Sequence, residues 1–178
     1  MIQNFDKIEE DMSSPLYIKP IRQEPDFCGN TVIQMYIHRD GIEAPIDEIA
    51  KIAGTTKENG TPIDGMEKAL KHYGYETFAK EHGTLDDLRY YIINKQIPVI
   101  VDWFSLEGGP GGHYSIVVDI NKKNITLRDP SFTKIRKISN KDFMASWFDY
   151  PGDYPKDKSV FIVRWMLVGT LRKTKPDD

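Results

Sequence analysis

The sequence predicts an α+β fold, with helices in the first half of the chain and a mainly antiparallel sheet in the second. Before residue 98 the apolar residues recur mostly at helical spacing, and glycines follow the segments. After Pro98 the apolar stretches are short and rich in β-branched and aromatic residues. Because the helices come first and the strands later, we expect the helices and the sheet to occupy separate parts of the domain. The chain has 178 residues, 39% of them hydrophobic and 29% charged, which suits one globular domain over residues 1–178.

The first half is expected to hold four helices and one short strand. The first helix runs from Cys28 to about His38, and Gly41 supplies a stop after it. In the third helix Thr61 is predicted to cap the N-terminus, and Thr84 has the same role in the fourth, where two aspartates suit the first turn. The remaining segments are helices over 44–56, 60–74 and 83–96 and a strand over 75–80.

The second half is expected to form the sheet. Its predicted strands cover residues 99–104, 114–120, 124–129 and 159–168, and a helix-like insert covers 138–149. Residues 1–20 are predicted to be an extended lead-in, because two prolines limit helix formation there. Residues 170–178 are predicted to be a loose tail.

Charge and composition narrow the class of protein. The net charge is −3. The chain has no excess of basic residues that would bind nucleic acid, and no run of basic residues that would bind an anionic membrane. The polar, acidic N-terminus does not resemble a signal peptide, and the apolar runs are far shorter than a membrane span. A single cysteine excludes an internal disulfide. These features predict a cytoplasmic protein, and the absence of clustered Cys and His spacing predicts no metal site and no cofactor.

Cys28 stands at the predicted start of the first helix. Helix N-termini carry unpaired N–H groups and a partial positive charge, which favour a thiolate over a thiol. Gly29 follows it, and without a side chain the backbone there is open to a substrate carbonyl. The alternative is that Cys28 is an inert buried cysteine, the commoner role of a lone thiol.

His113 and Asp129 favour the nucleophile over the inert cysteine. His113 opens a predicted strand, and Asp129 ends the next one. Two antiparallel strands joined by a short turn bring the start of one beside the end of the other, so Asp129 is expected beside His113. Asn121 and Asn124 fall at the turn and are expected to lie far from the histidine. A carboxylate in that position fixes the imidazole tautomer and stabilises the imidazolium. The alternative is that Asp129 only helps to form a turn before the proline that follows it.

Two further features complete the candidate site. Gln23 lies five residues before Cys28, where a side-chain amide can donate to an oxyanion together with a backbone N–H. The glycine-rich stretch 105–112 leads directly to His113. Gly111 and Gly112 are predicted to bind substrate there, and the stretch is expected either to cover the substrate groove as a flap or to be a plain loop.

This ordered set resembles the C39 and C39-like cysteine peptidases, which have a papain-like fold. The resemblance spans roughly residues 20–165. It is carried by Gln23, "CGN" at 28–30, "GTLDDLRYYIINKQIPVIV" at 83–101, "GGHYSIVVDI" at 111–120, "ITLRDPSF" at 125–132 and "ISNKDFMASW" at 138–147. The chain departs from the family pattern at Thr31, where a smaller residue is common, and in the long glycine-rich loop before the histidine.

The resemblance implies a helical half that carries Cys28 as nucleophile and a sheet half that carries His113 as base. It implies Asp129 as the group that orients the base and Gln23 as the oxyanion donor. The implied activity is a cysteine hydrolase, in particular a peptidase, acting on a peptide or another amide or acyl substrate through a thioester. An acyltransferase or transpeptidase would use the same residues, and a catalytically idle peptide-binding domain is the alternative from another class. No transporter segment accompanies the domain, so we expect a stand-alone protein.

Overall fold

The structure is a computed structural model that describes residues 10–105, 112–152 and 154–172. The described helices are α1 (Cys28–His38), α2 (Ile46–Ala53), α3 (Ile63–His72), α4 (Leu85–Arg89) and α5 (Asn140–Ser146), with a π-helical segment η1 (Tyr90–Lys95) and a 3-10 turn η2 (Lys158–Val160). The described strands are β1 (Tyr75–Lys80), β2 (Val99–Phe104), β3 (Gly112–Ile120), β4 (Asn124–Arg128), β5 (Arg136–Ser139), β6 (Phe148–Asp149), β7 (Ile162–Val163) and β8 (Met166–Leu171). The predicted α+β class is confirmed.

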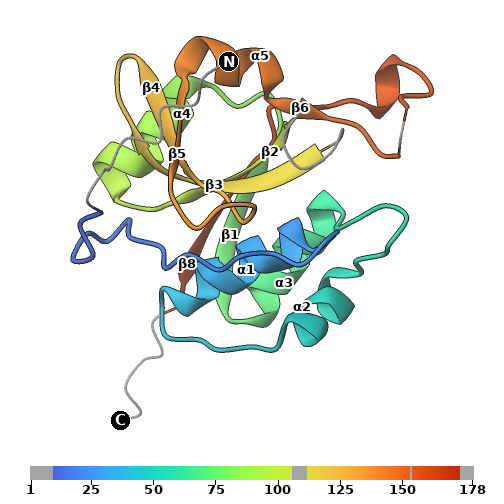
Figure 1. The fold of residues 1–178 in the computed structure, drawn as a ribbon, viewed down its shortest axis with the longest axis horizontal. Helices are drawn as coiled ribbons and strands as arrows, with labels where there is room; N and C mark the ends of the chain where they lie inside the picture. Colours follow the sequence, from blue (N-terminus) through green and yellow to red (C-terminus); the bar gives the residue numbers. More distant parts are fainter. Residues whose placement is uncertain (1–9, 106–111, 153, 173–178) are drawn as a thin grey trace.

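One curled sheet separates two groups of helices. Its strand order is β1-β8-β2-β3-β4-β5, and all the neighbouring strands are antiparallel. Figure 1 shows α1, α2 and α3 together on one side of the sheet, with α5 across the curled strands on the other. No helix of the described ranges is both long enough and apolar enough to cross a bilayer.

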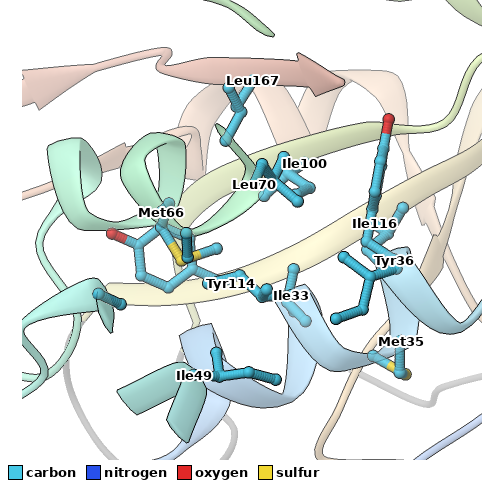
Figure 2. Close-up of a cluster of buried hydrophobic side chains, with 14 of the residues drawn as sticks. Ile33, Met35, Tyr36, Ile49, Met66, Leu70, Ile100, Tyr114, Ile116 and Leu167 are labelled. Carbon is cyan, nitrogen blue, oxygen red and sulfur yellow. The ribbon is translucent and has the colours of Figure 1, made fainter. Parts of the chain in front are cut away.

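Helix α1 is the central element of the helical half. It has the predicted bounds, and most of its side chains are buried because its sequence is apolar on nearly every face. Figure 2 shows Ile33, Met35 and Tyr36 of α1 within a cluster that also includes Ile116 of β3 and Leu167 of β8. The chain turns away after α1 at Gly41, whose φ of +80° favours glycine. Because α1 packs against α2 and α3 and also against β3 of the sheet, its position relative to the sheet is fixed.

Helix α3 starts differently from the prediction. Thr61 does not cap it, and Pro62 occupies the N-cap position without a side-chain hydrogen bond. The hydroxyl of Thr61 instead lies 2.9 Å from that of Thr55 and 3.3 Å from Asn30 Oδ1. Thr61 is buried against α1, so its hydroxyl reaches a polar partner there rather than the backbone of α3.

Replacing Gly65 with alanine should destabilise the protein. Within a helix this change normally stabilises by about 1 kcal/mol. Here an added Cβ would lie 2.0 Å from the carbonyl oxygen of Ala53, which is backbone at the end of α2. We expect a net loss of roughly 1–3 kcal/mol in the free energy of unfolding, measured by urea denaturation. The exposed Lys68→Ala on the same helix is the control and should change stability by less than about 0.5 kcal/mol. A more stable Gly65→Ala protein would contradict the close approach of α2 and α3.

The fourth helix begins at the predicted cap and then changes type. Thr84 accepts a hydrogen bond from the N–H of Asp87, and the Asp87 carboxylate accepts one from the N–H of Thr84, so a capping box is present. After Arg89 the helix continues as the π-helical segment η1, which ends at Gln96 with φ +55°. The hydrophobic period does not distinguish these two helix types.

The prediction of a single strand over 159–168 is wrong, because the structure has two strands there, β7 and β8. Arg164 has φ +51° and separates β7 from β8. The N–H of Arg164 donates to the carbonyl of Trp147 at 3.0 Å, while β7 pairs with β6 and β8 pairs with β1 and β2. The tail also starts later than expected. Thr170 and Leu171 belong to β8 and pair with Glu76 and Tyr75.

Candidate active site

Cys28 is the first residue of α1 and is partly buried. Phe27 holds the N-cap position and has no side chain that could cap the helix. The N–H of Thr31 donates to the Phe27 carbonyl at 2.9 Å, so the regular helical hydrogen bonds begin there and the earlier N–H groups have no helical acceptor. The thiol therefore lies beside unpaired backbone N–H groups at the N-terminal end of the helix.

His113 and Asp129 lie side by side at one end of the β3–β4 hairpin. His113 Nε2 is 2.7 Å from Asp129 Oδ1, and both side chains are buried. Asn121 accepts hydrogen bonds from the backbone of Lys123 and Asn124 at the opposite end of the hairpin. The contact that antiparallel pairing predicts for Asp129 is present, and the asparagines lie at the turn.

Two further donors hold the Asp129 carboxylate. Arg136 Nη1 donates to Asp129 Oδ2 at 2.6 Å, and the N–H of Ser131 donates to Oδ1 at 2.9 Å. Burial by itself would raise the pKa of Asp129, but His113, Arg136 and the Ser131 N–H hold it below its ordinary value. Asp129 therefore remains an anion beside the imidazole at neutral pH.

Sequence reasoning missed Arg136. Its guanidinium lies 5.0 Å from the ring centroid of Trp103, and the Trp103 ring lies 6.2 Å from that of His113. Arg136 belongs to β5, and an arginine at the start of a strand has no distinctive local pattern. The pairing of β5 with β4 brings it to the carboxylate.

His113 also interacts with Cys28, which contributes to the shifted pKa of the imidazole. Since Nε2 faces Asp129, Nδ1 is the atom left for the thiol. Burial by itself lowers the pKa of His113, but hydrogen bonds with Asp129 and with the Cys28 side chain outweigh it and raise this pKa to about 9. The imidazole is therefore protonated at neutral pH and can pair with a thiolate.

We expect Asp129→Asn to lower the pKa at which His113 titrates. The wild-type imidazolium persists at neutral pH and is lost as the pH rises through about 9. The variant removes the anion that raises this value, so the proton should leave at lower pH. The measurement is an NMR titration of the His113 ring protons. Asp119→Asn, an exposed substitution near the far end of β3, should leave the titration unchanged. An unchanged His113 titration in Asp129→Asn would contradict the electrostatic role of Asp129.

Gln23 is tied to the segment that follows Asp129. Its N–H donates to the Pro130 carbonyl at 2.8 Å, so the lead-in runs along the loop next to the histidine's partner. Its side-chain oxygen is buried and has no hydrogen-bond partner among the described residues. Its role as an oxyanion donor stays a prediction.

The glycines of the predicted substrate site have different environments. Gly29 is buried, and an added Cβ would lie 2.6 Å from the hydroxyl of Thr61, so close contact between α1 and α3 accounts for a glycine there. Gly111, with most of the expected flap, lies outside the described residues. Gly112 starts β3 and is exposed, and the Asp149 carboxylate lies directly against it. Substrate binding by Gly29, Gly111 and Gly112 remains a prediction.

Fold and site together define the class. A cysteine at the start of a buried central helix, together with a histidine and an aspartate in contact on an antiparallel sheet, is typical of papain-like cysteine peptidases. A model described as the Peptidase C39 family matches residues 19–150, which is more than half of the chain. The protein belongs to the Peptidase C39 family.

The chain is also similar to known relatives and to solved structures. An uncharacterised protein of Methanothermobacter marburgensis is 26% identical over 117 residues, covering 65% of this chain and 74% of the relative. The peptidase domain of Streptococcus ComA, a bifunctional ABC transporter, has a TM-score of 0.65 at 19% identity, covering 88% of this chain and 100% of that domain. A double glycine motif protease from an AMS/PCAT transporter, solved with its leader peptide, has a TM-score of 0.61 at 17% identity, covering 89% of this chain and 94% of the protease. The structural neighbours share the papain-like fold.

Proposed function

We propose that the protein is a peptidase that cleaves peptides through a thioester on Cys28, with His113 and Asp129 completing the triad. The carrying observation is the position of His113, whose Nε2 contacts Asp129 at 2.7 Å, and whose pKa is raised by Asp129 first and by Cys28 next. The family assignment supports the peptidase class. That a structural neighbour holds a leader peptide supports a peptide as substrate.

In the first step the Cys28 thiolate attacks the carbonyl carbon of the scissile peptide bond. The carbonyl oxygen becomes an oxyanion, which accepts hydrogen bonds from the Gln23 amide and from a backbone N–H at the start of α1. The tetrahedral intermediate collapses, the C–N bond breaks, and the His113 imidazolium gives its proton to the leaving amine. The product is a thioester between Sγ and the acyl part of the substrate.

In the second step His113, now neutral, removes a proton from water. The hydroxide attacks the thioester carbonyl, the C–S bond breaks, and the carboxylic acid product leaves. Asp129 stays ionised throughout and keeps the imidazole orientation fixed, since Arg136 and the Ser131 N–H also hold it. An amine in place of water would give acyl transfer with the same residues.

A covalent trap tests this proposal. The protein is incubated with a peptide that carries an acyloxymethyl ketone after a Gly-Gly sequence, and the modified residue is located by mass spectrometry. We expect one equivalent of label on Cys28 and none on Cys28→Ala. Turnover of the matching unmodified peptide, with and without added hydroxylamine, separates hydrolysis from acyl transfer by the products formed. A Cys28 that alkylates no faster than a free model thiol near pH 6, in a protein that cleaves no peptide, would leave the idle binding domain as the better description.

A further inference from the structure

Strand β1 is an open edge of the six-stranded sheet. The strand order places β1 at one end and β5 at the other, so β8 is the only described strand that pairs with β1 (Figure 1). An edge strand carries backbone N–H and C=O groups that point away from the sheet and can pair with another chain. Proteins often shorten or bulge such an edge, but β1 pairs with β8 without interruption over its six residues.

The backbone of Thr77 points to the open side of β1. Its partner in the register is Gly169 of β8, but the N–H and the carbonyl of Gly169 both bond to the Tyr36 hydroxyl. One step beyond the strand, the N–H of Arg172 donates to the Gly74 carbonyl at 3.1 Å. Hydrogen-bonded and non-hydrogen-bonded pairs alternate in an antiparallel ladder, so the even-numbered residues of β1 bond to β8. The backbone groups that point outward belong to Tyr75, Thr77 and Ala79. No backbone group of the described residues outside the ladder bonds to them.

The side chains of β1 divide between the two faces of the sheet. The Thr77 hydroxyl donates to a glutamate of α3 at 2.9 Å, so the odd-numbered side chains face the helical half. Glu76, Phe78 and Lys80 face the other way. The Phe78 side chain is 48% exposed, and its ring lies 6.2 Å from that of Tyr91 in η1. An exposed phenylalanine between an acid and a base on an unpaired edge suits a partner that supplies another aromatic ring and the opposite charges.

A second copy of β1 is such a partner, in one antiparallel register. With Phe78 opposite its own copy, the outward groups of Thr77 meet those of Ala79 in the copy, and Glu76 faces Lys80 of the copy. The neighbouring registers that keep these hydrogen bonds place Glu76 or Lys80 opposite Phe78. The next registers place two glutamates or two lysines opposite each other. The register centred on Phe78 therefore satisfies the hydrogen bonds and the charges together.

Both charged side chains can take this second partner. Lys80 Nζ donates one of its three N–H groups to Asp87 Oδ2 at 2.9 Å, which leaves two donors. Glu76 is exposed, and its ion pair with the exposed Arg172 spans 3.5 Å. The Phe78 pair would be a non-hydrogen-bonded pair, the type in which opposite side chains approach most closely. The two rings can therefore pack against each other.

We propose that the protein forms a symmetric dimer in which the β1 strands of two copies pair antiparallel about Phe78 and join the two sheets into one. The same surface of each copy meets its equivalent about a two-fold axis, which closes the assembly at two chains. One strand pair buries less area than a standard interface, so we expect a dissociation constant in the micromolar range. The dimer does not depend on the proposed peptidase function, because no residue of the candidate triad takes part in it.

Sedimentation velocity tests the dimer. Between about 5 and about 500 µM, a range that brackets a micromolar dissociation constant, we expect the wild-type protein to pass from one chain to two. Glu76→Lys places a lysine opposite Lys80 of the copy and should raise the dissociation constant at least about tenfold. Glu58→Lys makes the same change of charge at an exposed residue between α2 and α3, and should dimerise like the wild type.

Amide hydrogen exchange, followed by NMR, tests the register without a substitution. The N–H groups of Thr77 and Ala79 should exchange more slowly at high protein concentration than at low, because they enter hydrogen bonds only in the dimer. The N–H groups of Glu76 and Phe78 bond to β8 in each copy, so their exchange should change much less with concentration.

Three results would overturn the dimer. The first is a wild-type protein that remains a single chain over the whole concentration range, and the second is a dimer that Glu76→Lys weakens no more than Glu58→Lys does. The third is exchange at Thr77 and Ala79 that does not depend on concentration in a sample that dimerises, because another surface would then form the contact. If Glu76→Lys did not fold, the exchange of the wild-type amides would still decide.

Discussion

His113→Ala is expected to slow acylation of Cys28 by a peptide substrate about a thousandfold or more. The substitution removes both the imidazolium that pairs with the thiolate and the acid that protonates the leaving amine. Members of a triad act as one unit, so the loss of one costs nearly as much as the loss of several. The measurement is the single-turnover rate of thioester formation, followed by rapid quenching and mass spectrometry.

His72→Ala is the matched control for this experiment. His72 is exposed on α3, with no contact to the site, and its removal should leave the acylation rate near the wild-type value. Circular dichroism of both variants verifies that the fold is retained. If His113→Ala acylated at a rate within a few-fold of wild type, another group would have to be the base, and the triad would be wrong.

Trp147→Ala is expected to cause the largest loss of stability, about 3–5 kcal/mol in the free energy of unfolding. Trp147 is 1% exposed and is among the largest fully buried side chains. Its Nε1 donates to the Trp165 carbonyl at 2.9 Å, and its ring lies 5.0 Å from that of Phe143. The variant leaves a cavity and an orphaned carbonyl together, so it adds the cost of a lost hydrogen bond to that of lost burial.

Thermal unfolding measures this loss, and the melting temperature should fall by roughly 10 °C in a protein of this size. Tyr154→Ala removes a large aromatic residue that is 84% exposed, and its melting temperature should shift little. Trp147→Phe keeps most of the buried area but loses the hydrogen bond, so its melting temperature should lie between those of Trp147→Ala and Tyr154→Ala. Equal melting temperatures for Trp147→Ala and Tyr154→Ala would show that the contacts beneath α5 are not a core.

The candidate triad was predictable because each of its members carries a local signal. Cys28 precedes a run of apolar residues with helical spacing, and the helix begins at that residue. His113 and Asp129 are separated by two strands and a short turn, so antiparallel pairing alone brings them together. Such signals operate over a few residues or within one hairpin, which is the range that hydrophobic periodicity and turn chemistry describe.

The neighbours of the candidate triad were not predictable in this way. Arg136 reaches Asp129 because β5 pairs with β4, and Asp149 reaches Gly112 because β6 folds back over the ends of β2 and β3. Asp102 did carry a signal, since an acid within an apolar strand is unusual, but nothing in the local sequence indicates which group faces it. These contacts depend on where whole elements lie relative to one another.

The sequence by itself determined the α+β class, the start of α1 at Cys28, the strand positions of His113 and Asp129, and the Thr84 cap. Each follows from backbone preferences and side-chain periods that act over short stretches of chain. Only the tertiary structure decided that Thr61 turns toward α1 instead of capping α3, that Arg164 divides one apolar run into two strands, and that Asp102 and Asp149 lie close together. In those places contacts between distant elements outweigh local preference, because burial and pairing across the sheet stabilise more than a single cap or strand residue can.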